Sequence, residues 1–294
     1  MKRKKTGYLI VVCFAAWCIV MLQWNVLERA SDKSVDKGIR ELTETAGFRK
    51  LDISANILNK IAEYANFYSL DLSEVLSYYM IENNFELSGG NIKLYDVASF
   101  LEKLAKLKGD RQKDFESVKE AYAAIFNDVK YFPIPASSTE YPIEVSFADG
   151  WGSKRCYEDE THLHEGTDIM TNHMRGYVPV VSMTDGVVEN IGWLELGGYR
   201  IGIRSKSGGY FYYAHLYRYS KDFNVGDAVR AGELLGFMGD SGYGKAEGTV
   251  GKFAVHLHLG IYIKTKNHKE VSINPYAVLM FFDEKRILYN VQGE

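Results

Sequence analysis

The spacing of hydrophobic positions changes along the chain and divides it into three regions. Residues 8–27 are apolar with few interruptions, and a helix of that length spans about 30 Å, the thickness of a bilayer's hydrocarbon core. Residues 39–129 carry apolar side chains at helical spacing, whereas residues 141–283 contain short alternating runs between glycine turns. We therefore expect an α+β multidomain chain with a transmembrane helix, a small all-α domain and a C-terminal all-β antiparallel domain.

The region 39–129 is predicted to contain several short helices, with Ser73 as a plausible N-cap. Its apolar stripes are Ile57/Leu58/Ile61/Ala62/Ala65, Val75/Leu76/Tyr79/Met80, Val97/Phe100/Leu101/Leu104 and Phe115/Val118/Tyr122/Ile125. Residues 61–87 resemble the opening helices of lytic transglycosylase-type lysozyme folds, in which a helix-end glutamate is the general acid and Glu82 would match it. The Gly-Leu-Met-Gln-like stretch expected downstream is absent, which favours a solvated glutamate.

Short polar or irregular segments separate these regions. Residues 28–38 are polar and are interpreted as a juxtamembrane linker. Residues 130–140 contain two prolines and a Ser/Thr run, which predicts a second linker. Residues 1–7 form a basic tail, and residues 284–294 a C-terminal tail.

The charge pattern predicts where the chain resides. Lys2, Arg3, Lys4 and Lys5 precede the apolar run and should remain cytoplasmic, so we expect a single-pass membrane protein whose remaining chain lies outside the cytoplasm. A cleaved signal peptide is the alternative, but the run is long and no A-x-A-like site follows it. The net charge is −3 despite this basic tail, which argues against nucleic acid as a partner.

All seven histidines fall within the predicted β-region, and six of them lie between His162 and His258. A hairpin is expected there, because Gly208-Gly209 separates an alternating strand at Ile201 and Ile203 from residues 210–213. In a strand, His256 and His258 would point to the same face, with Leu257 on the opposite, core-facing side.

Zinc in a hydrolase takes three protein ligands from nitrogen and oxygen donors and keeps one position open. His164 and Asp168 could supply two of these ligands. One histidine of the 256/258 pair could bind metal while the other lies beside the reacting water. Of the other histidines, His173 and His268 are expected to be surface or core residues, and His162 is interpreted as a non-ligand despite its position two residues before His164.

Three motifs in this order resemble the lysostaphin/LytM-type zinc endopeptidases. They are HEGTD at 164–168, YAHL at 213–216 and HLHLG at 256–260, with supporting segments at 178–188, 226–242 and 273–276. The resemblance covers residues 141–283 and implies a compact antiparallel β-sandwich with the metal in a groove.

The resemblance also implies residue roles. His164, Asp168 and His258 match the Zn²⁺ ligands, and His215 and His256 match two catalytic histidines. We expect His256 to accept a proton from water and His215 to stabilise the reaction intermediate.

The implied function is a membrane-anchored zinc endopeptidase that cleaves stem peptides or cross-bridges of peptidoglycan. The alternatives are a non-catalytic wall-binding or scaffold protein of division or sporulation machinery on the same fold, and a metalloprotease acting on proteins. The helical domain could bind a protein partner.

Overall fold

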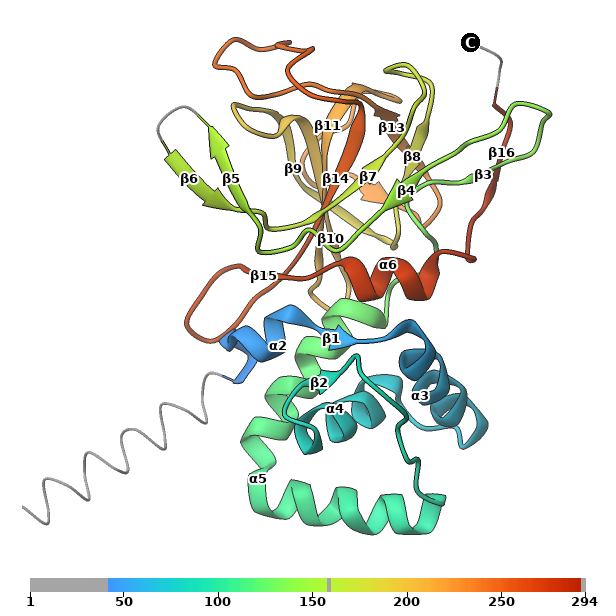
Figure 1. Ribbon diagram of the computed structural model, residues 1–294, viewed down its shortest axis with the longest axis vertical. Coiled ribbons are helices and arrows are strands. Elements are labelled where there is room, and N and C mark those ends of the chain that lie inside the picture. The colour runs from blue at the N-terminus through green and yellow to red at the C-terminus, as the bar shows by residue number, and fades with distance from the viewer. Residues whose placement is uncertain (1–41, 158–159, 292–294) are drawn as a thin grey trace, which may run out of the picture. The chain divides into compact units, whose positions relative to one another are not determined.

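The computed structural model describes residues 42–157 and 160–291. From Thr43 onward these residues belong to one compact unit. Helices dominate its first part and antiparallel strands its second, as Figure 1 shows. The predicted order of a helical region followed by a β-rich region is confirmed.

The helical part begins with short elements and ends in a long helix. Its helices are η1 (Leu42–Glu44), α2 (Ala46–Lys50), α3 (Ala55–Phe67), α4 (Leu72–Glu82) and α5 (Val97–Phe126), with a parallel pair of short strands, β1 (Asp52–Ile53) and β2 (Glu86–Leu87). The expectation that Ser73 caps α4 is wrong, because Asp71 precedes the helix and its carboxylate accepts hydrogen bonds from the backbone N–H groups of Ser73 and Glu74.

The last two apolar stripes of the helical part lie in the single element α5. The helix is interrupted at Arg111, whose φ of −141° and ψ of 42° are not helical. Most of the stripe residues are buried, whereas Leu101 is exposed. Tyr122, for example, is fully buried and stacks on Phe48 of α2 with ring centroids 5.0 Å apart.

The β-rich part forms a continuous antiparallel sheet. Its strands are β4 (Ser146–Phe147), β7 (Thr167–Met170), β8 (Pro179–Val181), β9 (Gly186–Leu194), β10 (Gly198–Ser205), β11 (Tyr210–Tyr219), β12 (Ala228–Val229), β13 (Leu234–Met238), β14 (His256–Ile263) and β15 (Val271–Ile273). Among the described residues the main order is β12-β9-β10-β11-β14-β7-β4, while β13 joins β11 to β8 and β15 pairs with β14. A separate hairpin, β5 (Lys154–Tyr157) and β6 (Glu160–Leu163), precedes β7.

Side-chain alternation gives the central strands one apolar and one polar face. Leu257 and Leu259 of β14 and Ile201 and Ile203 of β10 are fully buried on the core side. The predicted hairpin is confirmed, because β10 and β11 pair antiparallel, with Arg204 opposite Tyr210. The opposite face of the strands therefore carries the polar side chains.

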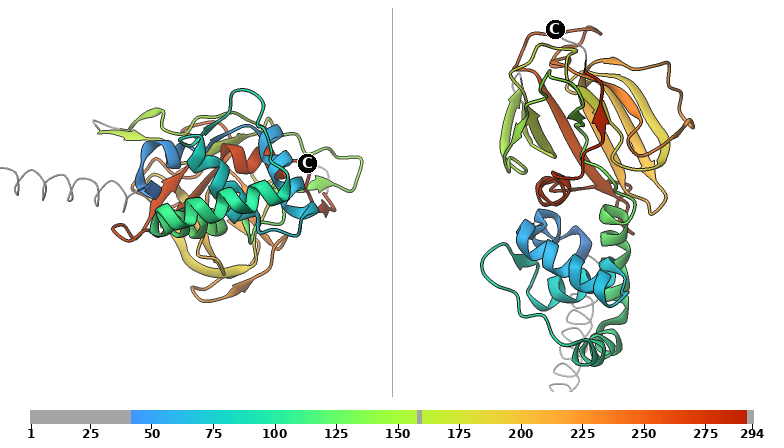
Figure 2. Two further views of the ribbon diagram at one scale, coloured as in Figure 1. Left: turned by 90° about the horizontal axis from the view of Figure 1, so that it is seen from below. Right: turned by 90° about the vertical axis from the view of Figure 1, so that its right-hand side faces the viewer.

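The segment after α5 packs into the β-rich part. Phe132 is fully buried and its N–H donates to Lys285 O at 2.9 Å, and β3 (Ala136–Ser137) pairs in parallel with β16 (Leu288–Tyr289). Helix α6 (Tyr276–Phe282) lies between β15 and β16 in sequence. The right-hand view of Figure 2 shows the helical and β-rich parts again as separate layers of elements.

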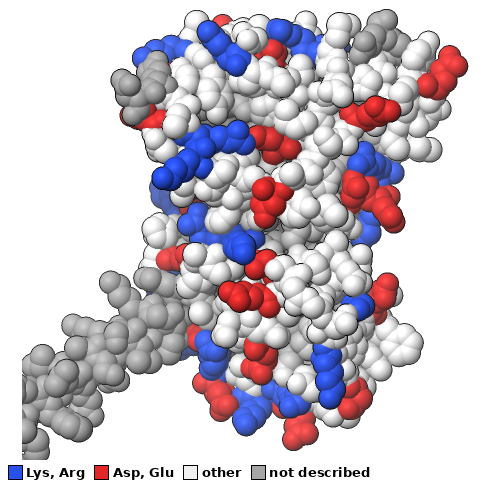
Figure 3. Space-filling view, in the orientation of Figure 1, with Lys and Arg blue, Asp and Glu red and all other residues white. Residues whose placement is uncertain are grey.

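The predicted tail at 1–7, anchor at 8–27 and linker at 28–38 lie outside the described residues. Within the described residues, no helix is both long and apolar enough to cross a membrane. The proposed domain boundaries stay predictions. On the face drawn in Figure 3, side chains of both charge signs are interspersed.

Candidate active site

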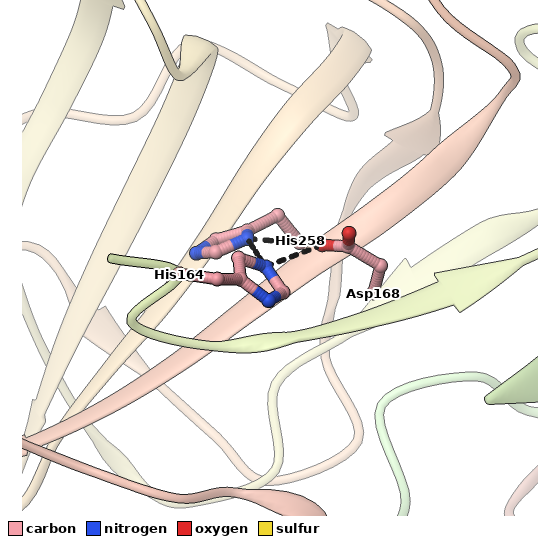
Figure 4. Close-up of side chains that lie close together, drawn as sticks. All are labelled: His164, Asp168 and His258. Carbon is pink, nitrogen blue, oxygen red and sulfur yellow. Dashed lines mark hydrogen bonds and ion pairs between the residues drawn. The ribbon is translucent and has the colours of Figure 1, made fainter. Parts of the chain in front are cut away.

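Strands β7 and β14 bring together three residues that are far apart in sequence. Their register places Asp168 directly opposite His258, and His164 lies just before β7. His164 Nε2 is 3.0 Å from Asp168 Oδ1 and 3.0 Å from His258 Nδ1, and the latter two atoms are 3.1 Å apart (Figure 4). Two imidazole nitrogens and a carboxylate oxygen thus form a nearly equilateral triangle.

The hydrogen bonding around the triangle shows what it can hold. His164 Nδ1 donates to the carbonyl oxygen of Gly150 at 2.9 Å, which in the neutral ring leaves Nε2 as an acceptor. This lone pair faces Asp168 Oδ1, which is also an acceptor when the carboxylate is ionised. Acceptors that converge in this way are stabilised by a shared cation. Ligand atoms of a tetrahedral zinc with bonds of about 2.0–2.1 Å lie about 3.3 Å apart, so the donor set fits this metal with a slight expansion.

The backbone around the triangle is shaped for close approach. A Cβ added at Gly166 would lie 2.5 Å from Leu259 O and 2.6 Å from His258 Nε2, so no other residue fits there without displacement. This explains the glycine in the HEGTD motif. The Gly150 carbonyl fixes the orientation of the His164 ring, as outer-shell carbonyls do for many metal-binding histidines.

Asp168 is also held from outside the triangle. Arg155, on β5, donates from Nη2 to Asp168 Oδ2 at 2.8 Å. The two carboxylate oxygens therefore have different partners, with Oδ1 facing the histidines and Oδ2 facing the guanidinium. Nothing in the motif spacing singled out Arg155, which comes nine residues before His164 on the separate hairpin β5–β6.

The electrostatics of the triangle follow from burial and hydrogen bonding. Burial opposes ionisation of Asp168, but the hydrogen bonds with His164 and His258 outweigh it and hold its pKa far below the usual 3.8. Burial lowers the pKa of His258 below 6.5, and the neighbouring Asp168 carboxylate only partly offsets this effect. The site therefore favours an ionised Asp168 carboxylate beside a neutral His258 imidazole, the protonation states that metal ligation requires of these two residues.

The two predicted catalytic histidines lie beside the triangle. His256 is two residues before His258 on the same face of β14, and its Nε2 is 3.7 Å from Asp168 Oδ1. The His215 ring centroid is 4.7 Å from that of His256 and 5.9 Å from that of His258. The five residues singled out from the sequence are thus in one cluster.

Both histidines have the same ring nitrogen fixed by a backbone carbonyl. His215 Nδ1 donates to Ser241 O, and His256 Nδ1 donates to Ala254 O, each at 2.8 Å. In the neutral rings Nε2 is then the acceptor. Burial lowers the pKa of His215 well below 6.5, so this ring is neutral at physiological pH.

The backbone at His215 is unusual for a strand. Its φ is +62°, in the left-handed region; the pairing of β11 with β10 shifts register across it, between Tyr213 and Leu216, and the pairing with β13 shifts just after it. A bulge of this kind re-aims a side chain. Strain of this order persists only where the surroundings hold it, here by the bond from His215 N to Gly197 O at 2.8 Å.

The remaining histidines lie outside this cluster. His162 is opposite Arg155 in the hairpin β5–β6 and its Nε2 is 3.3 Å from the Glu160 carboxylate. His173 stacks on Tyr177, and His268 is exposed near Glu44. In residues 42–157 and 160–291, the triangle is the one group of three or more His, Cys, Asp or Glu side chains arranged to hold a metal.

Comparison with solved structures identifies the family. The chain aligns with the crystal structure of a glycyl-glycine endopeptidase candidate named lytM from Ruminococcus gnavus, at 39% identity and a TM-score of 0.70, covering 87% of this chain and 99% of that one. The model of peptidase family M23 matches residues 162–275, which contain all five clustered residues. The chain belongs to peptidase family M23. The resemblance to lysostaphin/LytM-type enzymes is therefore confirmed at the level of the family.

Two curated M23-like relatives share only part of their length with the chain. The L-Ala–D-Glu endopeptidase of Bacillus subtilis is 40% identical over 166 residues, which are 56% of this chain and 48% of the relative. The glycyl-glycine endopeptidase ALE-1 of Staphylococcus capitis is 34% identical over 97 residues, 32% of this chain and 23% of that protein. The chain thus spans less than half the length of these relatives, and they cleave differently named bonds.

Proposed function

We propose that this M23 peptidase is a zinc endopeptidase that hydrolyses peptide bonds of peptidoglycan. The observation that carries the proposal is the convergence of three acceptors, His164 Nε2, Asp168 Oδ1 and His258 Nδ1, within 3.1 Å of one another. Relatives named as L-Ala–D-Glu and glycyl-glycine endopeptidases support peptidoglycan as the substrate class.

The three converging residues would hold the zinc. When bound there, zinc supplies Lewis acidity, which polarises a peptide carbonyl and lowers the pKa of a water molecule. Gly150 orients the His164 ring, and Arg155 keeps the outer oxygen of Asp168 occupied, so that one carboxylate oxygen faces the metal position.

His256 is assigned as the proton acceptor. Its Nδ1–H is held by Ala254 O, so its Nε2 lone pair points toward the ligand cluster. The Asp168 carboxylate, 3.7 Å away, would stabilise the ring once it is protonated. The protonated ring can then donate to the leaving amine, the second half of general acid–base catalysis.

His215 is assigned a different role in the reaction. From the sequence we expected it to stabilise the intermediate by donating a hydrogen bond. Its only ring proton is used by Ser241 O and its burial disfavours a second one, so the neutral ring offers an acceptor at Nε2. We therefore assign His215 to orient an O–H or N–H group of the reactants.

The scaffold alternative predicts loss of one or more of these residues, whereas all five are present and clustered. The test is to measure zinc content and the release of new peptide termini from purified peptidoglycan, with the full chain and with Asp168→Ala. About one zinc per chain and cleavage, both absent in Asp168→Ala, are expected. Zinc-free, folded wild-type protein without activity would contradict the proposal. Parallel digestion of casein distinguishes a peptidoglycan endopeptidase from a metalloprotease that acts on proteins, because only the latter should cleave casein.

The placement of this enzyme in the cell is a further part of the proposal. The apolar run at 8–27 and the preceding basic residues support a single-pass anchor with the peptidase outside the cytoplasm. In this arrangement 28–38 is a linker, 39–129 a helical domain that could bind a protein partner, and 141–283 the sandwich-type peptidase domain. Fractionation and protease accessibility of intact cells test the topology.

A further inference from the structure

A row of residues crosses the sheet on the face that carries the triangle, which we call the site face. Asp168 of β7 pairs with His258 of β14, and His258 pairs with Ala214 of β11. The next strand is β10, where Tyr199 pairs with Leu216 and Ile201 pairs with Tyr213. Arg200 lies between these two pairs, opposite Ala214 and the bulge at His215. Arg200 is therefore two strands from His258, about 10 Å between backbones.

Strand alternation places Arg200 on the site face. Its neighbour Ile201 is fully buried on the core side, so Arg200 points the other way. The electrostatics agree, because the charge of Arg200 counteracts the rise in pKa that burial causes at Tyr210 and Tyr212. Tyr212 itself lies edge-on to the His258 ring, with centroids 6.1 Å apart. Ala214, which has a small side chain, is the residue of β11 that pairs with His258 in this row.

Among the residues that the structure describes, the buried Nη1 of the Arg200 guanidinium has no hydrogen-bond partner. Arg204, on the same face of the same strand, shows the opposite arrangement, since it binds Glu189 through two nitrogens at 2.6 and 2.7 Å and Glu270 at 3.0 Å. A buried guanidinium nitrogen without an acceptor is costly, and a ligand that supplies the acceptor would remove this cost.

We infer that Arg200 is a specificity-determining residue that binds a carboxylate of the substrate beside the cleaved bond. A guanidinium matches a carboxylate through two parallel N–H···O bonds, which gives both affinity and orientation. The row across the site face puts the backbone of Arg200 two strands, about 10 Å, from that of the metal ligand His258. The inference rests on the proposed function and narrows its substrate class.

The two bonds named for the relatives differ in whether a carboxylate lies beside the cleaved amide. A γ-linked glutamyl residue has a free carboxylate on the carbon next to the cleaved amide, whereas a glycine bridge has no such group. Arg200 therefore points to glutamate-containing stem peptides, the type of bond named for the Bacillus relative, over glycyl-glycine bridges.

The test compares kcat/KM for synthetic L-Ala–γ-D-Glu–L-Lys peptides with the glutamate α-carboxyl either free or amidated, and for pentaglycine. Wild type should prefer the free carboxylate by about 10- to 100-fold, the range for a charge-assisted hydrogen bond. Arg200→Met should remove this preference, and Arg200→Lys should keep part of it. Lys206→Met removes an exposed charge about 20 Å along the same hairpin and should leave the preference unchanged.

Each outcome decides the inference. Equal preference in wild type and in zinc-loaded Arg200→Met overturns it, as does faster cleavage of pentaglycine by both. Zinc content and circular dichroism establish that the variants are folded. If wild type cleaves none of the peptides and no peptidoglycan, the proposed function fails. Calorimetry with the uncleaved pair then tests Arg200 alone, where selective binding of the free carboxylate, lost in Arg200→Met, supports the inference and equal binding overturns it.

Discussion

The helical part at 43–129 and the β-rich part at 136–291 both bury extensive apolar cores, but they bury different polar groups. In the helical part the buried polar side chains serve local structure. Ser77 Oγ, for example, donates to Ser73 O one turn earlier, and Asp114 binds Arg111 at the kink of α5. In the β-rich part three buried imidazoles each have one nitrogen bound to a backbone carbonyl and the other directed at the cluster.

This difference shows what separates a structural polar group from a reactive one. A capping side chain forms hydrogen bonds with backbone groups of its own helix, so these bonds are not directed at a ligand. An imidazole whose Nδ1–H is fixed by a carbonyl retains a lone pair of defined direction at Nε2. Convergence of such lone pairs requires residues from several strands, which a sheet supplies and short helices in this chain do not.

The largest effect should come from removing a zinc ligand. We expect Asp168→Ala or His258→Ala to lose bound zinc and to lower kcat/KM by at least about 10³-fold, because both the Lewis acid and the charge balance of the site are lost. Zinc by mass spectrometry and peptide hydrolysis measure this.

Glu82→Gln in the helical part is the matched control, since Glu82 is exposed at the last residue of α4. It should retain both zinc and activity. Loss of activity in Glu82→Gln would mean that the helical part contributes chemistry, which would break the contrast between the two parts.

The next largest effect should separate turnover from metal binding. His256→Ala and His215→Ala should keep most of the zinc and lose about 10²- to 10⁴-fold in kcat, since the first removes the proton acceptor, the second removes the group that orients a reactant, and neither removes a ligand. Should His256→Ala lose the metal while His258→Ala keeps it, the assignment of the pair is reversed.

Removal of the Arg155 guanidinium beside the Asp168 carboxylate should have an intermediate effect, on zinc affinity. Arg155→Met takes away the donor to Asp168 Oδ2, and zinc affinity should fall by about 10- to 100-fold. Competition with a chelator measures this on the apo protein without any activity assay. Lys154→Met, on the same strand and exposed, is the control, and an equal loss in both variants would argue against a specific role for Arg155.

The sequence was sufficient for the parts of this site that repeat in a fixed local pattern. The H-x-H spacing requires both rings on one face of a strand, and the glycine of HEGTD is dictated by close backbone approach to His258. It was not sufficient for residues that reach the site only through the fold. Gly150 acts through its backbone carbonyl, which every residue type has, and the positions of Arg155 and Arg200 near the site follow from strand register.

The fold shows the same limit. Periodicity located α3 and α4 but gave the wrong cap for α4, because Asp71 and Ser73 are both good capping residues and only the backbone decides between them. It also separated the two halves of α5, and this division is confirmed, because the backbone at Arg111 leaves the helical region between them. The error in the cap concerns a boundary, where local propensity is weakest against tertiary packing.

The smallest predicted effect comes from Arg49, a residue of the helical part that contacts the β-rich part near the site. Arg49 of α2 donates from Nε to Ser272 O at 3.0 Å and lies 5.5 Å from the Trp151 ring centroid. Trp151 follows Gly150, whose carbonyl orients the His164 ring. Arg49→Met should therefore lower the free energy of unfolding by about 1–2 kcal/mol.

Arg49→Met should also weaken zinc binding, by no more than about fivefold, equivalent to about 1 kcal/mol, because the Gly150 carbonyl remains but its loop is less firmly held. Lys50→Met, which removes an ion pair with nearby Asp52, is the control from the same helix. Denaturant titration and chelator competition on the two variants separate the effects. A loss of zinc affinity confined to Arg49→Met would show that the helical part supports the metal position through this loop. Equal affinity in both would mean that the β-rich part orients His164 without it.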